Sequence, residues 1–461
     1  MFKLAGGIGD MLGDPGRAVR VMAVPLFFAF LVSALQTFID GAWCSGLGAD
    51  PLSAIGISAP VYRIVVALGL GMGVGVSASL ARSIGAGDMG RASRLNRQAV
   101  VLSLALSVPV SVVSYVVAEP LVVISGGGNN VDLCMDYVTP FVLCSFPLIL
   151  SGMLQGMLRG EGDAKRAMAL SVVASLANII LDPLMIYGLG MGVAGASMAT
   201  CIATAVSSAI GLCWFYGGRT EVPVARGGPL FDRGLARDIF SVGAPHSVSL
   251  VVVPLFIVPE QAMVVSCGGT DGLVVYIAGF TIVSLAMIPS QAIASATVPV
   301  VSAALGQRDI RKAYGAVSHS MRAAVIIGAA LGLVFLLFPG YAVSAYTYGE
   351  DMSRLAGEMA KAVMIYSAVP AFKGVLDVAM AAIQACRRAV LATANAIFRE
   401  VLFLAFFAAA AGMSMDAIYW SVDAVNVICA MTAVALMAAS LRGAKRSILA
   451  PPSDAGPARN Q

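Results

Sequence analysis

Charged residues are scarce in this sequence. Of its 461 residues, 12% are Asp, Glu, Lys or Arg, whereas 59% are hydrophobic. A soluble domain has about twice that share of charged residues and cannot bury so much apolar surface in its own core. The composition therefore excludes a soluble globular protein and requires a lipid bilayer around most of the chain.

The patterns typical of metal, redox and nucleic-acid sites are also missing. The eight cysteines are isolated, with no CxxC pair, and the two histidines have no spacing to cysteines or acids that suggests zinc binding or nucleophilic catalysis. The net charge of +4 comes from basic residues scattered singly between apolar runs, without interleaved aromatic residues. We therefore expect no cofactor, no enzymatic activity and no nucleic-acid partner.

Long apolar runs dominate the sequence. They are about 18 to 25 residues long, enough to cross a hydrocarbon core of roughly 30 Å at about 1.5 Å per residue. We expect an all-α integral membrane protein with twelve transmembrane helices, which we place at residues 20–41, 52–80, 94–117, 135–158, 166–187, 192–215, 239–264, 272–300, 315–338, 360–384, 390–411 and 415–440.

Lysine and arginine fall mainly in alternate loops between these runs. Segments 82–97 and 308–312 are basic, for example, whereas the intervening loop 268–272 has no basic residue. The positive-inside rule makes the basic loops cytoplasmic, and with twelve spans both termini are then cytoplasmic. Basic residues before the first run resemble the start of a cleavable signal, but the run continues to Asp40, which favours a retained first helix.

An internal repeat relates the two halves of the chain. Pro25 and Asp40 in the first predicted helix are 15 residues apart, as are Pro245 and Glu260 in the seventh, at an offset of 220. The second and eighth predicted helices then end in a shared G-x-x-D-x-x-basic-A pattern at an offset of 221, in residues 85–92 and 306–313. The acidic residue of each pattern is typical of a helix cap.

Six spans in each half mean that both halves enter the membrane in the same sense. An axis along the membrane normal then relates them, and we expect two pseudo-symmetric six-helix lobes around a central cavity. The predicted organisation is a cytoplasmic N-terminus (1–19), an N-lobe (20–216), a cytoplasmic interlobe loop (217–238), a C-lobe (239–440) and a cytoplasmic tail (441–461).

Ionisable residues inside the predicted helices are the candidate functional groups. Each costs about 2.5 to 3.5 kcal/mol to insert and therefore calls for a partner, a water-filled cavity or a function. Asn178 and Asp182 lie one helical turn apart, before a proline, and so share one helix face. Counting about 1.5 Å per residue along each helix places them at the same membrane depth as Asp40 and Thr200. Two carboxylates with amide and hydroxyl oxygens suit either Na⁺ or a bound proton.

Glu260 and Asp377 form a second candidate set, in the C-terminal half. Three prolines make the seventh helix hard to place, so the sequence leaves open whether these two acids meet. A role in cation coupling or substrate binding competes with salt bridges to Lys373 or Arg399. Glu400 and Asp423 are further acids without an assigned place.

Several motifs together resemble the multidrug and toxic compound extrusion family, which belongs to a superfamily that also contains lipid-linked oligosaccharide flippases. The resemblance covers roughly residues 15 to 440 and rests on Pro25 with Asp40, the turns at 85–88 and 159–163, Asn178-x-x-x-Asp182-Pro183, and Gly195-Ala-Ser-Met-Ala-Thr200.

The resemblance implies two lobes that export organic cations and other amphipathic compounds as Na⁺ or H⁺ enters. It makes Asp40, Asn178, Asp182 and Thr200 the N-lobe cation site, where Na⁺ would bind, and it matches Glu260 and Asp377 to acidic positions of a C-lobe site found in some branches. Gln36, one turn before Asp40, occupies a position where some members carry an aromatic hydroxyl, so we expect that part of the N-lobe network to differ here. Gln36 is also a candidate cavity residue.

The function expected from the sequence is therefore antiport by a monomer in the cell membrane, with alternating access of the two lobes. A flippase for a lipid-linked sugar is the alternative on the same architecture, and a cationic cavity able to hold pyrophosphate would favour it. A channel suits lobe-internal acids less well. The sequence does not choose between Na⁺ and H⁺ and does not identify the transported compound.

Overall fold

The computed structural model describes residues 7–124, 130–344, 347 and 350–449. Every regular element in these residues is a helix. Eleven helical stretches are long and apolar enough to cross a membrane, and the bent pair α5 and α6 makes a twelfth. The expectation of an all-α protein with twelve transmembrane helices is confirmed.

The helices fall into two sets along the chain. The first set consists of α1 (Ile8–Leu12), α2 (Pro15–Ser45), α3 (Ala49–Gly85), α4 (Met89–Val122), α5 (Val131–Leu143), α6 (Ser145–Gly160), α7 (Ala164–Pro183), the π-helix η2 (Leu184–Gly188) and α8 (Gly192–Tyr216). The second set consists of α9 (Arg233–Val252), η3 (Val253–Phe256), α10 (Ile257–Leu285), α11 (Ile288–Gly306), α12 (Ile310–Leu337), α13 (Pro339–Ser344), α14 (Glu350–Ser353), α15 (Ala356–Ile365), η4 (Tyr366–Ala368), α16 (Val369–Ala385), α17 (Ala389–Ala411) and α18 (Met415–Leu449).

Five predicted spans are interrupted near a proline, among them 166–187, where η2 follows Pro183. The span predicted at 135–158 bends by 55° between α5 and α6, two residues before Pro147. Pro254 lies in η3, Pro289 follows the break between α10 and α11, and Pro370 begins α16 after η4. Proline has no N–H to donate to the carbonyl one turn back, so each helix is weakened at that turn.

The seventh and eighth spans meet at Gly269, inside the element labelled α10. Its φ of 63° and ψ of −161° are not helical. The stretch Arg233–Leu285 has 53 residues, about 80 Å if it were one straight helix and far more than a bilayer needs. The part before Gly269 therefore completes the seventh span, and the part after it continues into α11 as the eighth.

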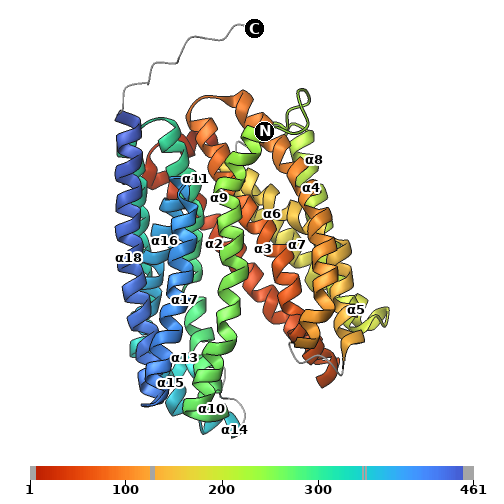
Figure 1. Cartoon of the computed structure of the whole chain (residues 1–461), viewed down its shortest axis with the longest axis vertical. Coiled ribbons are helices and arrows are strands. Elements are labelled where there is room, and N and C mark those ends of the chain that lie inside the picture. Colours follow the sequence, from red (N-terminus) through yellow and green to blue (C-terminus); the bar gives the residue numbers. More distant parts are fainter. Residues whose placement is uncertain (1–6, 125–129, 345–346, 348–349, 450–461) are drawn as a thin grey trace.

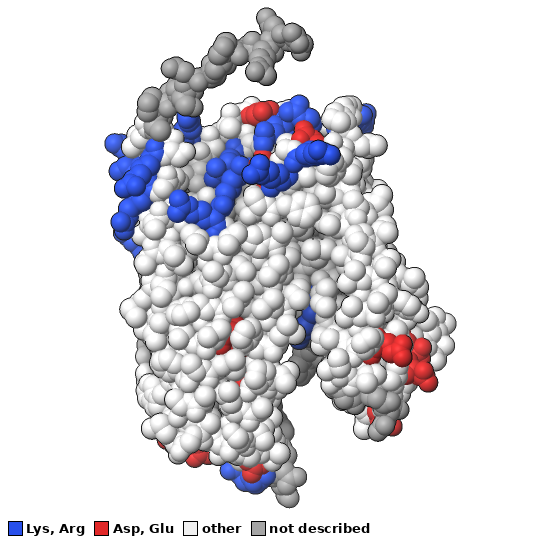
Figure 2. Space-filling view, in the orientation of Figure 1, with Lys and Arg blue, Asp and Glu red and all other residues white. Residues whose placement is uncertain are grey.

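The two sets of helices form two lobes that separate toward one end (Figure 1). The lobes lie together at the other end, where the described chain begins and where α18 ends. Lysine and arginine side chains gather at that same end (Figure 2). The basic loops of the sequence thus share one side of the molecule, as their alternation predicted.

The repeated turns cap equivalent helices in the two lobes. Asp88 accepts a hydrogen bond from the backbone N–H of Arg91 at 2.7 Å, and Asp309 accepts one from that of Lys312 at 3.0 Å. The predicted capping role is therefore confirmed for both acids. Arg308 has a φ of 57° at the place where the first repeat has a glycine.

The glycines that begin these turns bring the lobes together. A Cβ atom on Gly85 would lie 2.1 Å from the carbonyl oxygen of Ala303, and one on Gly306 would lie 2.2 Å from that of Arg82. Each lobe thus presents its own repeat glycine to the backbone of the other. This reciprocal contact closes the basic end of the molecule.

We expect the substitution Gly85→Ala to open this end. The added methyl group has no room against a backbone carbonyl, so the closed packing should lose about 1 to 3 kcal/mol relative to an arrangement in which the lobes separate there. Spin labels at Arg94 and Arg442, in a background without native cysteines, measure the distance between the lobes. Gly90→Ala is the control, because its Cβ would lie 3.6 Å from the nearest atom. An unchanged distance distribution in Gly85→Ala would contradict the closing role.

The glycine-rich stretch of α3 contacts both lobes. A Cβ on Gly73 would lie 2.3 Å from the carbonyl oxygen of Gly152 in α6, whereas one on Gly75 would lie 2.2 Å from that of Ile239 in α9. Glycines on two faces of one helix therefore allow close backbone packing in two directions. The glycine pattern of α3 therefore serves helix packing.

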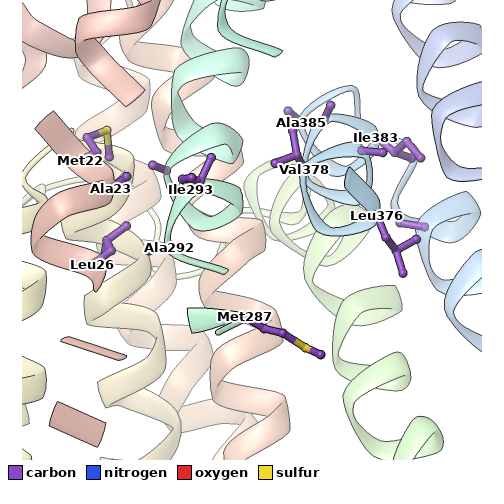
Figure 3. Packing of buried hydrophobic residues seen from close by; sticks show 14 of the residues in the cluster. Met22, Ala23, Leu26, Met287, Ala292, Ile293, Leu376, Val378, Ile383 and Ala385 are labelled. Carbon is purple, nitrogen blue, oxygen red and sulfur yellow. The ribbon is translucent and has the colours of Figure 1, made fainter. Parts of the chain in front are cut away.

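Helix α2 also connects the lobes. In Figure 3, Met22 and Ala23 of α2 face Ile293 of α11, and Val378 of α16 lies on the other side of α11. The same helix packs on α7 within its own lobe. A change in the position of α2 therefore affects the interface between the lobes.

A carboxyl group is buried at the basic end, outside the spans. Glu161 follows α6 and is 1% exposed; its Oε1 accepts a hydrogen bond of 3.1 Å from the amide of Asn96, which also donates to the carbonyl of Val222 at 2.8 Å. Burial raises the pKa of Glu161 from an ordinary value of 4.5 to about 8. The folded protein therefore keeps this carboxyl group protonated at neutral pH.

This raised pKa predicts a pH-dependent effect of Glu161→Gln. Between pH 4.5 and about 8 the Glu161 carboxyl group loses its proton in the unfolded chain but keeps it in the folded chain. Rising pH therefore favours unfolding over this range, and the folded protein loses part of the free energy of unfolding that it has below pH 4.5. Because glutamine cannot ionise, the variant should not lose stability in this pH range. The variant should melt at a higher temperature than the parent at pH 8.5 and at a similar one at pH 4.5, measured by thermal unfolding in detergent. An identical difference at both pH values would show that Glu161 is not the titrating group.

Candidate functional site

The predicted N-lobe residues lie together in the structure. Asp40 is on α2, Asn178 and Asp182 are one turn apart on α7, and Thr200 is on α8. Asn178 and Asp182 are each 1% exposed, and Asp40 is partly buried. The carboxyl groups of Asp40 and Asp182 lie close enough to interact electrostatically, and Gln36 and Asn178 connect them by hydrogen bonds.

Asn178 is the centre of the hydrogen-bond network in this N-lobe site. Its amide nitrogen donates to Asp182 at 2.9 Å and to the hydroxyl of Thr200 at 3.4 Å. Gln36 donates from one amide nitrogen to the side-chain oxygen of Asn178 and to Asp40, the latter at 3.3 Å. Gln36 therefore joins the predicted network directly, in contact with two of its members.

The backbone beside the site is irregular. Pro183 ends α7, and the next five residues form the π-helix η2. Within η2, the Tyr187 hydroxyl donates to the backbone carbonyl of Trp43 at 2.5 Å and so holds the last turn of α2 against this segment. π-Helical turns are rare and occur frequently at functional sites.

Two carboxyl groups in contact within a lipid-embedded protein repel each other when both are ionised. Asp40 Oδ1 is buried and receives no hydrogen bond from any donor in the described chain. A proton shared between the two acids, or a cation held by their oxygens with those of Asn178 and Thr200, relieves the repulsion. The described residues contain no group of three or more His, Cys, Asp or Glu side chains that suits a transition metal.

The predicted C-lobe acids have separate partners. Asp377 forms an ion pair with Lys373, one turn away on α16. Glu260, on α10, is 7% exposed and lies close enough to the carboxyl group of Glu400 on α17 to interact with it electrostatically. The structure thus joins Asp377 to one of the bases considered from the sequence and brings Glu260 to another acid.

Glu400 is a site residue that the sequence reasoning did not place. Arg399 donates to its Oε1 from two nitrogen atoms, at 2.9 and 2.5 Å, while Glu260 Oε1 is buried without a donor in the described chain. A signal was present in the repeat, because Glu400 follows Asp182 by 218 residues, close to the offset of 220 that relates Glu260 to Asp40. Each lobe therefore has an acid pair at equivalent places.

A central cavity of about 400 Å³ lies between the lobes. Phe30 of α2, Leu70 of α3 and Arg159 of α6 line it from the first lobe, and the second lobe contributes residues of α9, α11 and α16, among them Lys373 and Asp377. A neighbouring chamber of about 250 Å³ shares part of this lining and extends to Arg399. Figure 2 shows basic surface within the cleft that separates the lobes.

The cavity and the N-lobe acid pair are separate sites. Neither Asp40 nor Asp182 lines the cavity, and α2 connects the two, since Phe30 lies ten residues before Asp40 on the same helix. Pro25 lies inside α2 and weakens the helix near the interface with α11. A shift of α2 can therefore transmit a change at the acids to the cavity.

Two six-helix lobes around a central cavity, with buried acids inside the lobes, define a membrane transporter. A sequence profile of the MatE family matches residues 25–184 and 248–403, in both lobes. The chain belongs to this family, the multidrug and toxic compound extrusion transporters, and it is not an enzyme.

Individual relatives agree with this assignment. A FAD transporter of Shewanella oneidensis is 27% identical over 190 residues, which cover 40% of this chain and 42% of that protein. The multidrug export protein MepA of Staphylococcus aureus, strain bovine RF122, is 21% identical over 73% of this chain and 72% of its own length.

Solved structures extend the similarity over the whole fold. A transporter of the MOP superfamily from Pyrococcus furiosus, described as having a binding pocket of reverse polarity, superimposes with a TM-score of 0.89 and 28% identity over 96% of this chain and 100% of that one. A multidrug resistance MATE transporter in an outward-facing conformation superimposes with a TM-score of 0.89 and 27% sequence identity. The match covers 96% of this chain and 100% of that one.

Proposed function

We propose that this transporter exports small amphipathic molecules in exchange for a cation, Na⁺ or H⁺, that enters through the N-lobe site. The placement of the Asp40 and Asp182 carboxyl groups in one hydrogen-bond network, through Gln36 and Asn178, is the observation that carries this proposal. Such a pair is costly in a membrane unless it binds and releases a positive charge during the working cycle.

Coupling would act through α2. Binding of a cation to Asp40 and Asp182 neutralises their repulsion and favours one packing of α2 against α7, and release favours another. Because Phe30 on the same helix lines the cavity, the change reaches the bound substrate. The two lobes then rock between a state open at the basic end and one open at the other.

The remaining parts of the proposal concern placement. We propose that the basic end is cytoplasmic, that both termini lie there, and that the protein acts as a monomer in the cell membrane, since cavity and acid pairs lie within one chain. We keep the predicted lobe limits of 20–216 and 239–440, flanked by cytoplasmic segments. Helix α18 continues to Leu449, and the rest of the predicted tail lies outside the described residues.

Glu260 has a proposed role as well, now with Glu400 as its partner. The equivalent position of the two acid pairs supports a second coupling site in the C-lobe, whereas the ion pair with Lys373 supports a place for Asp377 in the cavity wall. A flippase for a lipid-linked sugar is less well supported. Pyrophosphate calls for several cations, and the Lys373 and Arg399 charges are paired with acids.

Purified protein in liposomes tests the exchange. A fluorescent amphipathic dye is loaded inside, and its movement is followed under an inward Na⁺ gradient alone and under a pH gradient alone. One of the two gradients should accelerate dye movement over liposomes without protein, and that gradient identifies the coupling ion. Movement that is equally fast under both gradients and under none would contradict antiport.

A further inference from the structure

The central cavity contains one basic side chain without an acidic partner. Arg159 lies in the last turn of α6 and lines the cavity, with 8% of its surface exposed. Within the described residues it forms no ion pair, and its one hydrogen bond runs from Nε to the carbonyl of Gln155 at 3.2 Å. Its two terminal nitrogen atoms therefore keep their donors for another acceptor.

The other charges of the cavity are neutralised in place. Lys373 is paired with Asp377 on α16, and Arg399 in the neighbouring chamber is paired with Glu400. The acid nearest to Arg159 in sequence, Glu161, points to Asn96 instead. The cavity thus carries one uncompensated positive charge in a surrounding of low dielectric, where such a charge attracts anions strongly.

The wall around Arg159 offers both polar and apolar contacts. His246 and Gln384 line the same cavity as Arg159 and share a hydrogen-bond contact of 3.1 Å, so the cavity wall contains polar atoms besides the guanidinium group. Phe30, Leu70 and Leu250 supply an apolar surface on the same cavity. A ligand with an anionic group and a flat apolar body fits this arrangement.

We infer that the cavity selects amphipathic anions, with a carboxylate or phosphate group bound in two-pronged fashion by Arg159 and the apolar body held between the lobes. The inference rests on the proposed function, since it takes the cavity as the transport site. It departs from the organic cations that the family resemblance implies.

A matched pair of dyes tests this selectivity. Carboxyfluorescein is anionic and rhodamine 123 is cationic, and both have a xanthene ring system. Binding to the purified protein is measured by fluorescence anisotropy for the parent and for Arg159→Gln, Arg159→Lys and Asp377→Asn. Arg94→Gln is the control, because Arg94 is exposed on α4 and does not line the cavity, yet its loss changes the net charge by the same amount.

The parent should bind carboxyfluorescein about tenfold or more tightly than rhodamine 123. Arg159→Gln should abolish that preference, Arg159→Lys should keep part of it, and Asp377→Asn should strengthen it by freeing Lys373. Arg94→Gln should leave it unchanged. If Arg159 only stabilised the end of α6, Arg159→Gln would lower stability and weaken both dyes alike, and that result would overturn the inference.

Failure of the inference differs from failure of the exchange mechanism. Tighter binding of rhodamine 123 by the parent, together with its gradient-driven movement, would refute anion selection and leave antiport intact. Movement of carboxyfluorescein that ignores both ion gradients would contradict antiport, while a binding preference that depends on Arg159 would still support anion selection.

Discussion

Replacing Asp182 with asparagine should reduce gradient-driven dye transport by about 10- to 100-fold, the range of a typical coupling free energy between two sites. Asparagine keeps the shape and can still accept from Asn178, but it cannot exchange a proton or supply a full negative charge to Na⁺. Asp40→Asn should behave in the same way, because the two carboxyl groups act as a pair. Proteoliposomes under the effective ion gradient measure the rate.

The matched control for this substitution is Asp136→Asn. Asp136 is an exposed acid on α5, outside the N-lobe site, so the same chemical change there should leave transport at the parental rate. Dye binding in the cavity should survive in Asp182→Asn, since Asp182 does not line it. Coupled transport at the parental rate in both aspartate variants would refute the role of the acid pair.

Gly152→Leu should destabilise the whole N-lobe. A Cβ on Gly152 would lie 2.4 Å from the carbonyl carbon of Gly69 and 2.8 Å from the backbone nitrogen of Leu70, so backbone atoms would have to move. Overpacking of this kind costs about 3 kcal/mol or more, because α3 and α6 cannot separate without losing their other contacts. Thermal unfolding in detergent should show a lower melting temperature.

Gly56→Leu provides the comparison on α3 itself. A Cβ at Gly56 would meet nothing within 4 Å, and the residue is exposed. This variant should melt close to the parent. If both variants melted alike, the close approach of α3 and α6 would not be what stabilises the lobe.

The sequence predicted the spans because each apolar run is long and ends at glycine, proline or charge. It also predicted the break between the seventh and eighth spans, because Gly269, where the backbone leaves the helical conformation, lies in the loop expected at 268–272. The bend before Pro147 was not predicted. Proline indicates a weak turn, but packing decides whether the helix bends there.

The candidate site was predictable to the extent that its residues share one helix or one repeat. Asn178 and Asp182 lie a turn apart, and helix depth brought Asp40 and Thr200 to them. The repeat offset that relates Glu400 to Asp182 was the one sequence signal for the partner of Glu260. The actual approach of the two acids depends on how α10 is kinked and on which face α17 presents. Arg159 was taken for a loop residue because its charge stands beside a turn, although the lobes place it against the cavity.

Ion movement driven by substrate is the most direct test of exchange. Proteoliposomes receive an inward gradient of carboxyfluorescein, without any initial ion gradient, and the outward flux of the coupling ion is recorded with a sensor dye for Na⁺ or pH. In the parent, dye entry should drive an outward flux of the coupling ion. In Asp40→Asn and Asp182→Asn the ion flux should not exceed that of protein-free liposomes. Dye entry without ion movement in the parent, or undiminished ion movement in both variants, would contradict coupling through the N-lobe acid pair.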